Sequence, residues 1–343
     1  METSFVTSVG QRYSVTESSQ VGAVRRAAQA LASDAGFTEV AASELAIIVN
    51  ELASNLIKHG GGGELLLSRV RDDDRAGIEM LAIDKGVGIA NLARSMTDGY
   101  STAGSLGVGL GAIARLAKDF DVYSRPGGGT SMLARVWCDR DRHAKAPPPR
   151  VVRAGAVGVP KLGQEVSGDG WAMREIKGTT VVLLVDGLGH GPQAALTTAV
   201  AMRYFERCTH DNPVEIMNGL HQAMRPTRGA VAAVAALHPE TGNLRYAGIG
   251  NITGVLMGPD GTRRHLMSFD GTLGYQVRTV REATHDWTPG SWFAMFSDGL
   301  SPRLDATAYP GLSQHDPVLA AGVLYRDFHR TSDDATILVV NHS

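Results

Sequence analysis

The chain has 343 residues, a length that indicates about two domains, and its 43% hydrophobic and 20% charged content is typical of globular proteins. The formal net charge is -2, so neither nucleic-acid binding nor a basic membrane-binding surface is indicated. No apolar stretch reads as long enough to span a bilayer, and residues 1–10 lack a signal-peptide pattern. Cys138 and Cys208 are isolated, which favours a reducing, cytoplasmic location.

Two helices are predicted first. One follows Ser19 and continues to about Leu31, because its apolar residues recur at helical spacing. The other is predicted over 42–59. On that helix Glu51 and Asn55 lie one turn apart, so they can contact the same ligand. Taken alone, this pair is more often a solvated helix face.

Two strands are predicted next, over 64–70 and 77–84. The second strand ends at Asp84, which presents an acceptor, and it is followed by Gly86 and Gly88. Glycines at these positions allow the backbone to approach a ligand closely. The sequence therefore predicts a ligand contact at the end of this strand.

A glycine-rich run follows a stretch without clear periodicity, 90–103, which is interpreted as a loop with the character of a lid. The run, 104–111, leads into a helix predicted over 112–120. Free N–H groups and the helix dipole at such an N-terminus favour phosphate. A last strand is predicted over 131–136.

Four short patterns occur in this half in a fixed order: Glu51-x-x-x-Asn55, Asp84-x-Gly-x-Gly88, Gly107-x-Gly-x-Gly111 and Gly129-Thr130. The order covers about 14–136 and resembles the GHKL (Bergerat-fold) ATPases. Within that group it is most similar to the small serine kinases of bacterial partner-switching systems, of the RsbT and RsbW type. The resemblance implies an α/β sandwich that binds ATP and Mg²⁺.

The resemblance also implies roles for individual residues. Asn55 would hold the Mg²⁺ that bridges the phosphates, Glu51 would act as the base on the attacking hydroxyl, and Asp84 would bind the adenine amine. Gly107, Gly109 and Gly111 would surround the phosphates, and Thr130 would support the adenine end. Such a set suits phosphoryl transfer, which needs positioning, a metal and a carboxylate that orients the hydroxyl.

A polar segment that ends in three prolines, 139–150, cannot be a buried strand or a helix interior. Proline runs favour stiff, extended spacers. We therefore expect an ATP-binding domain over 1–138, a linker over 139–152 and a second domain over 153–343.

Acidic residues in the second half follow or precede runs of strand character at four places. They are Asp169, Asp186, Asp298 and the adjacent pair Asp333 and Asp334. A single Asp at the end of a strand is typical of an ordinary turn. Four carboxylates that converge repel one another unless a cation lies among them, and Mg²⁺ or Mn²⁺ suits oxygen ligands. Two such ions about 3.5–4 Å apart can acidify a bridging water and clamp a phosphoryl group.

The runs Val166–Asp169, Asp186–Gly191, Ala247–Asn251, Ser297–Leu300 and Asp333–Thr336 resemble the PPM-family metal-dependent phosphatases, in their SpoIIE and RsbX branch. The resemblance covers about 154–340 and implies an α-β-β-α sandwich with two antiparallel sheets. It implies that Asp186 bridges both ions and is central to catalysis, and that Gly187 adds its carbonyl oxygen. Asp169, Asp298 and Asp333 would complete the metal sites, with Asp333 preferred over Asp334.

Two further points stay open from the sequence. His190 lies in a glycine-rich turn, where a histidine is more often structural than a proton donor. Eukaryotic members of the family hold the phosphate with an arginine, and no counterpart can be placed in this sequence.

Together the resemblances imply a bifunctional regulator of a bacterial partner-switching pathway, with STAS-domain antagonist proteins as substrates and a homodimer as one option. It would phosphorylate or dephosphorylate Ser or Thr on them. In a second interpretation the phosphatase is active and the first domain only senses ATP or binds a partner. In a third, the chain is a non-enzymatic binder of the anti-sigma type.

Overall fold

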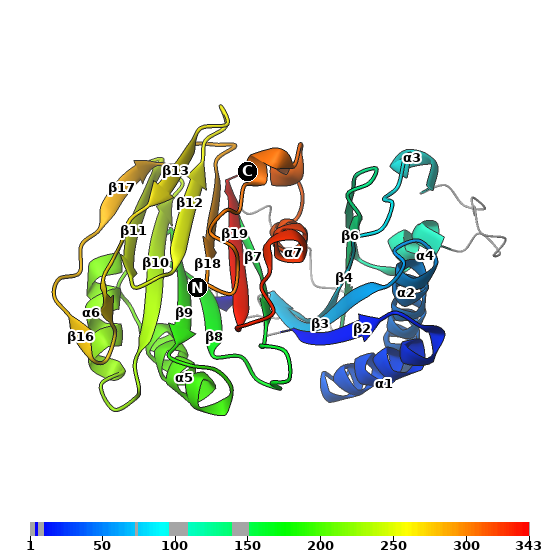
Figure 1. The fold of residues 1–343 in the computed structure, drawn as a ribbon, viewed down its shortest axis with the longest axis horizontal. Helices are drawn as coiled ribbons and strands as arrows, with labels where there is room; N and C mark the ends of the chain where they lie inside the picture. The colour runs from blue at the N-terminus through cyan, green and yellow to red at the C-terminus, as the bar shows by residue number, and fades with distance from the viewer. Residues whose placement is uncertain (1–3, 6–9, 73–74, 96–108, 139–150, 343) are drawn as a thin grey trace. The chain divides into compact units, whose positions relative to one another are not determined.

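The computed structural model describes residues 4–5, 10–72, 75–95, 109–138 and 151–342. The chain forms two compact units, one of Gly10–Pro147 and one that joins Met1–Val9 to Pro148–Ser343 (Figure 1). The expected division grouped all of 1–138 together. The structure differs from this division at β1 (Ser4–Phe5), which pairs with strand β8 (Asp169–Ile176) of the second unit. The division at Pro147 falls inside the expected linker, whose residues 139–150 lie outside the described part of the chain.

The first unit has one antiparallel sheet of five strands in the order β2-β3-β4-β6-β5. Its strands are β2 (Gln11–Val15), β3 (Gly63–Asp72), β4 (Arg75–Asp84), β5 (Asp119–Ser124) and β6 (Thr130–Trp137). Its helices are α1 (Ser18–Asp34), α2 (Glu39–Lys58), α3 (Leu92–Ser95) and α4 (Gly109–Leu116). Apolar residues of α1, α2 and α4 pack with those of the strands into one core, so this unit is an α/β sandwich.

Helix α2 is the central helix of this core. Thr38 caps its N-terminus by accepting from the Ala41 N–H at 3.3 Å. Leu45, Leu52 and Leu56 of the helix are completely buried. Helix α2, with a mean hydropathy of 1.4, is long and apolar enough by composition to cross a membrane. The expectation that no apolar stretch is long enough to span a bilayer is therefore wrong for this helix. Its buried face shows that the same composition suits the core helix of a folded domain.

The helix predicted over 112–120 ends four residues earlier, at Leu116. Residues 119–124 instead form β5, which pairs with β6. Val122 and Tyr123 are buried there, and the backbone N–H of Lys118 donates to the Arg135 carbonyl at 3.0 Å. Pairing with a neighbouring strand therefore overrides the helical reading of this segment.

The second unit contains two packed sheets. The described residues form a seven-stranded sheet in the order β1-β8-β9-β10-β11-β14, with β17 also on β11, and a five-stranded sheet in the order β13-β12-β18-β19-β7. All pairings within the two sheets are antiparallel except that of β11 with β14. The strands of the first sheet, besides β1 and β8, are β9 (Thr179–Gly187), β10 (Ala230–His238), β11 (Asn243–Ile249), β14 (Ser268–Phe269) and β17 (Ala283–Asp286). Those of the second are β7 (Val152–Val159), β12 (Thr253–Met257), β13 (Arg263–Leu266), β18 (Trp292–Phe296) and β19 (Ala335–His342).

Helices cover the outer faces of both sheets. Helices α5 (Pro192–Arg207) and α6 (Pro213–Ala223) pack on the first sheet, and α7 (Pro317–Phe328) packs on β7 and β19 (Figure 1). Side chains from both sheets, such as Leu184 and Met295, share the core between them. The remaining elements are β15 (Gly271–Thr272), β16 (Gln276–Val277) and two 3-10 turns, Ala306–Ala308 and Leu312–Gln314. This layering is the α-β-β-α sandwich that the sequence predicted.

Candidate active sites

Strand ends from both sheets of the second unit bring the acidic residues together. Asp169 begins β8, and Asp186 lies directly opposite it on β9 in the sheet register. Asp298 follows the end of β18, and Asp333 precedes the start of β19, both in the other sheet. The acids are therefore gathered because these strand ends meet at one end of the sandwich.

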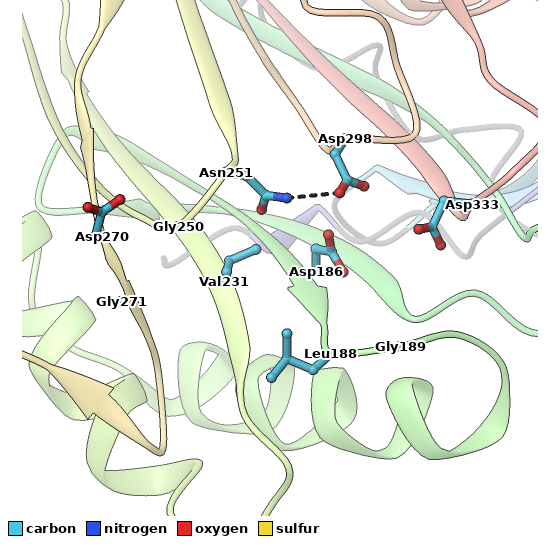
Figure 2. Close-up of a pocket in the computed structure, with 10 residues that line it drawn as sticks. All are labelled: Asp186, Leu188, Gly189, Val231, Gly250, Asn251, Asp270, Gly271, Asp298 and Asp333. Carbon is cyan, nitrogen blue, oxygen red and sulfur yellow. Dashed lines mark hydrogen bonds between the residues drawn. The ribbon is translucent and has the colours of Figure 1, made fainter.

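A cavity of about 390 Å³ lies at this end of the sandwich. Its lining includes Asp186, Asp298 and Asp333, and Figure 2 shows these three carboxylates grouped on one side of it. Asp270 lies apart from them in the same view, beside Gly271. The three grouped carboxylates therefore form an acidic wall.

The acids strongly affect one another. Burial, followed by the charges of Asp169, Asp298, Asp333 and Asp334, raises the pKa of Asp186 to about 9. Burial also raises the pKa of Asp169 to about 7, although the hydroxyl of Ser297 opposes this shift. Burial and the charge of Asp333 raise the pKa of Asp298. Such a cluster favours a bound cation, which removes the mutual repulsion.

Polar residues that the sequence did not single out orient two of these carboxylates. The Ser297 hydroxyl donates to Asp169 Oδ2 at 2.6 Å and accepts from the Thr336 N–H at 3.0 Å. Asn251 Nδ2 donates to Asp298 Oδ2 at 2.8 Å (Figure 2). The position of Asn251 in the glycine-rich run 247–251 was the available signal for this residue. The signal for Ser297 was its place beside Asp298.

The structure separates Asp333 from Asp334. The Asp334 side chain is 3% exposed, and it accepts from the backbone N–H groups of Lys161 and Gly168, each at 2.7 Å. Asp333 instead faces the cavity. Asp334 therefore fixes the surrounding loops, whereas the Asp333 carboxylate is placed to meet a ligand.

The chemistry of these donors fits hard divalent cations. All the acidic residues offer carboxylate oxygens, and Gly187 lies between Asp186 and the cavity-lining Leu188. In the described part of the chain, no three acidic, His or Cys side chains are already close enough to hold an ion by themselves. His190 is exposed and is not among the residues that line the cavity.

The first unit gathers Asp84 and Thr130 at the ends of β4 and β6. Asp84 is 5% exposed, and its Oδ1 accepts from the N–H groups of Gly86 at 2.8 Å and Thr130 at 3.1 Å. The Thr130 hydroxyl lies 2.9 Å from that of Ser124. Asp84 therefore organises the turn after β4 and the start of β6.

The C-terminal part of α2 adjoins this group. A Cβ placed on Gly60 would lie 2.7 Å from the Asp84 Cβ, so the end of α2 packs tightly against β4. Glu51 and Asn55 are partly buried on α2, and Asn55 Nδ2 is enclosed with no hydrogen-bond partner among the described residues. A buried, unpaired amide is costly to a fold unless something else binds it.

Packing explains the glycines after Asp84. Gly88 has φ +72°, and a Cβ there would collide with the Arg125 carbonyl oxygen. A Cβ on Gly86 would lie 2.6 Å from the His59 carbonyl oxygen. Gly109 and Gly111 lie in the first turn of α4. Gly107, and the part of the predicted lid from 96 to 103, lie outside the described residues.

Comparisons with known proteins match both halves of the chain. The family described as "Histidine kinase-like ATPase domain" matches residues 15–135, and "Stage II sporulation protein E (SpoIIE)" matches residues 176–343. The serine/threonine-protein kinase RsbT of Bacillus subtilis (strain 168) is 34% identical over 115 residues, which are 34% of this chain and 86% of RsbT. Through its N-terminal half this chain belongs to the family of RsbT, and its residues 176–343 match the SpoIIE family. The N-terminal half is therefore a kinase-type ATPase domain of the RsbT kind.

The SpoIIE-type half is similar to the phosphoserine phosphatase RsbX of the same organism, at 26% identity over 141 residues, 41% of this chain and 71% of RsbX. A crystal structure of RsbX with magnesium has a TM-score of 0.50 at 24% identity and covers 56% of this chain and 96% of that one. A structure titled for the bacterial stressosome has a TM-score of 0.52 at 25% identity, with 55% and 99% coverage. The C-terminal half is a Ser/Thr phosphatase domain of the PPM type, and the two-domain chain is a regulator of the partner-switching type.

Proposed function

We propose that this cytoplasmic protein is a bifunctional regulator that phosphorylates and dephosphorylates Ser or Thr on STAS-domain antagonist proteins. The observation that supports the phosphatase half is the acidic cluster, in which burial, followed by the charges of four neighbouring aspartates, raises the pKa of Asp186 to about 9. Such a cluster needs divalent cations to keep its carboxylates charged at neutral pH. The resemblance of the halves to RsbT and RsbX supports the opposed activities and the choice of substrate.

In the phosphatase domain, the Asp186 carboxylate would contribute to the binding of both Mn²⁺ or Mg²⁺ ions, and Gly187 would add its carbonyl oxygen. Asp169, Asp298 and Asp333 would complete the two sites. The bound ions would supply an acidified water and charge neutralisation for hydrolysis of a phosphomonoester. Ser297 orients Asp169 and Asn251 orients Asp298 by donating to their Oδ2 atoms. The protein's own contribution is therefore to hold together carboxylates that would otherwise repel one another.

In the kinase-type domain, Asn55 would bind Mg²⁺ through its side-chain oxygen, and Glu51 one turn away would accept the proton of the attacking hydroxyl. The enclosed Asn55 Nδ2, which has no hydrogen-bond partner among the described residues, supports a ligand with an acceptor atom at this position, such as a phosphate oxygen. Asp84 and Thr130, already joined by a hydrogen bond, would bind the adenine end together with Gly86 and Gly88. Gly107, Gly109 and Gly111 would contact the phosphates through their N–H groups.

A second candidate function keeps the phosphatase and gives the first domain only an ATP-sensing or partner-binding role. The observation that favours it is that no hydrogen bond or ion pair among the described residues holds the Glu51 carboxylate in place. Domain borders near 138 and 153 and a homodimer belong to the proposal in either form.

The phosphatase is tested with the full chain, Mn²⁺ and a phosphoserine-bearing STAS-domain protein. Asp186→Asn should lower the rate by about 10²-fold or more, the scale on which loss of one electrostatic stabiliser acts. Asp270→Asn is the matched control, because Asp270 lines the same cavity apart from the grouped carboxylates. Hydrolysis that persists unchanged in the presence of a chelator would refute the metal assignment.

The kinase is tested separately by transfer from radiolabelled ATP to the unphosphorylated STAS-domain protein. The wild type should transfer phosphate, and Asn55→Ala and Glu51→Gln should not, since each removes one proposed role. If wild type and Asn55→Ala transfer equally little, the second candidate function replaces the first. The phosphatase result is unaffected by this outcome.

A further inference from the structure

The described side chains that line the cavity beside Asp186 carry no positive charge. Among the described residues that line it are four aspartates and no Lys or Arg. A phosphomonoester carries up to two negative charges, and those of its oxygens that the proposed cations do not bind need hydrogen-bond donors, which carboxylates cannot supply. Arginine suits this role, because its planar guanidinium donates to two oxygens at once.

Arg228 is held at the edge of this cavity. Its Nη1 donates to the Leu188 carbonyl at 3.3 Å, and the Leu188 N–H donates to the Gly229 carbonyl at 3.1 Å. Leu188 and Gly189 both line the cavity. Three residues beyond Arg228, Val231 lines it too and is the register partner of Asp186. The backbone around Arg228 is thus tied to the strand that carries Asp186.

Gly189 leaves no side chain between the guanidinium and the cavity. It has φ +90°, and a Cβ at this position would lie 3.2 Å from Arg228 Nη1. The guanidinium therefore rests beside the bare backbone of a cavity-lining residue. Arg228 is exposed, and among the described residues it forms no ion pair, so most of its five N–H donors remain available.

Arg330 also lies near the acids, but its charge acts on one of them. Its backbone N–H donates to the Gly299 carbonyl at 2.8 Å, and its charge opposes the rise in the pKa of Asp298 that burial causes. Its charge is thus directed at a carboxylate of the site. Among the described residues, Arg228 forms no ion pair with an acidic side chain.

We propose that Arg228 binds the phosphoryl oxygens of the substrate at the mouth of the Asp186 cavity. This inference rests on the proposed phosphatase chemistry. It assigns the substrate-binding arginine, for which the sequence offered no candidate, to the segment 228–229, which is hydrogen-bonded to Leu188. The substrate class is that of the proposed function, a phosphoserine or phosphothreonine of a protein.

The experiment compares Arg228→Gln with Arg228→Lys in the full-length protein with Mn²⁺. One readout is KM and kcat on a phosphoserine peptide, and the other is the Kd of inorganic phosphate by calorimetry. Arg228→Gln should raise KM and Kd by about tenfold, equivalent to about 1.4 kcal/mol, with a much smaller change in kcat. Arg228→Lys should restore part of the binding, because it keeps the charge but loses the planar fork.

Two variants serve as controls. Arg225→Gln removes the same charge from an exposed residue of the same segment and should leave both constants unchanged. Arg330→Gln tests whether any nearby positive charge suffices. The inference is overturned if Arg228→Gln binds phosphate as the wild type does, or if Arg225→Gln loses as much.

The two proposals can fail separately. Phosphate binding that depends on Arg228 in a protein without hydrolytic activity would refute the proposed function and keep this inference. Hydrolysis with a normal KM in Arg228→Gln would refute this inference and keep the proposed function. Absence of both binding and hydrolysis in the wild type would reject both.

Discussion

Asp333 and Asp334 are neighbours in the chain, yet the fold uses their carboxylates differently. Asp334 accepts two backbone N–H groups in a buried place, so Asp334→Ala should lower the free energy of unfolding by about 1.5–3 kcal/mol. Asp333→Ala should barely change stability but raise the Mn²⁺ concentration for half-maximal activity by about tenfold or more. Urea unfolding and a metal titration measure the two effects, and the reverse pattern would contradict this assignment.

A buried histidine gives the second unit a dependence on pH. His342 is 5% exposed and stacks on Trp287 with ring centroids 5.4 Å apart, and burial lowers the pKa of His342. As pH falls below about 6.5, the unfolded state therefore binds the proton before the folded state does. The stability from neutral His342 is present above that pH and is lost as pH falls towards the folded pKa.

The melting temperature of the phosphatase domain should therefore drop between about pH 7.5 and pH 5.5, and it should drop less in His342→Phe. Phenylalanine preserves the stacking on Trp287 and removes the titrating group. Burial also lowers the pKa of His238, His265 and His285, so part of the dependence should remain. An identical slope in the wild type and the variant would show that His342 does not contribute.

At the scale of elements, α2 joins the stability of the first domain to its candidate site. Leu45 is completely buried, so Leu45→Ala should destabilise this domain by about 2–5 kcal/mol. Ile47, two residues away and 44% exposed, is the matched control and should change stability by less than about 0.5 kcal/mol. Calorimetry of the full chain measures both, and equal effects would place the buried face of α2 elsewhere.

At the scale of the whole molecule, the chain consists of two compact units with separate cores. We expect two calorimetric transitions, one raised by Mn²⁺ and the other by ATP with Mg²⁺. A ligand at about 100 times its Kd stabilises its domain by about 2.7 kcal/mol. Asp186→Asn should abolish only the Mn²⁺ shift, and Asn55→Ala only the ATP shift. If either variant abolished both shifts, the two sites would not be independent.

The sequence alone predicted most of the architecture of both domains. Strand runs that end in Asp-Gly, as at Asp186 and Asp298, are local signals, because a turn must follow where a strand stops. The stripe of α2 is equally local. Such local patterns allowed individual strands and helices to be predicted, whereas the two sandwich folds were implied by the resemblance to known families.

Only the tertiary structure decided matters that depend on residues far apart in the chain. Residues 119–120 were predicted as the end of a helix, and they belong to strand β5 because β6 lies beside them. The different uses of Asp333 and Asp334 follow from Lys161 and Gly168, more than a hundred residues away in sequence. The contact of Arg228 with the Leu188 turn exists because β9 and β10 pair. Periodicity reports which face of an element is apolar, whereas a site depends on which elements meet, and packing alone settles that.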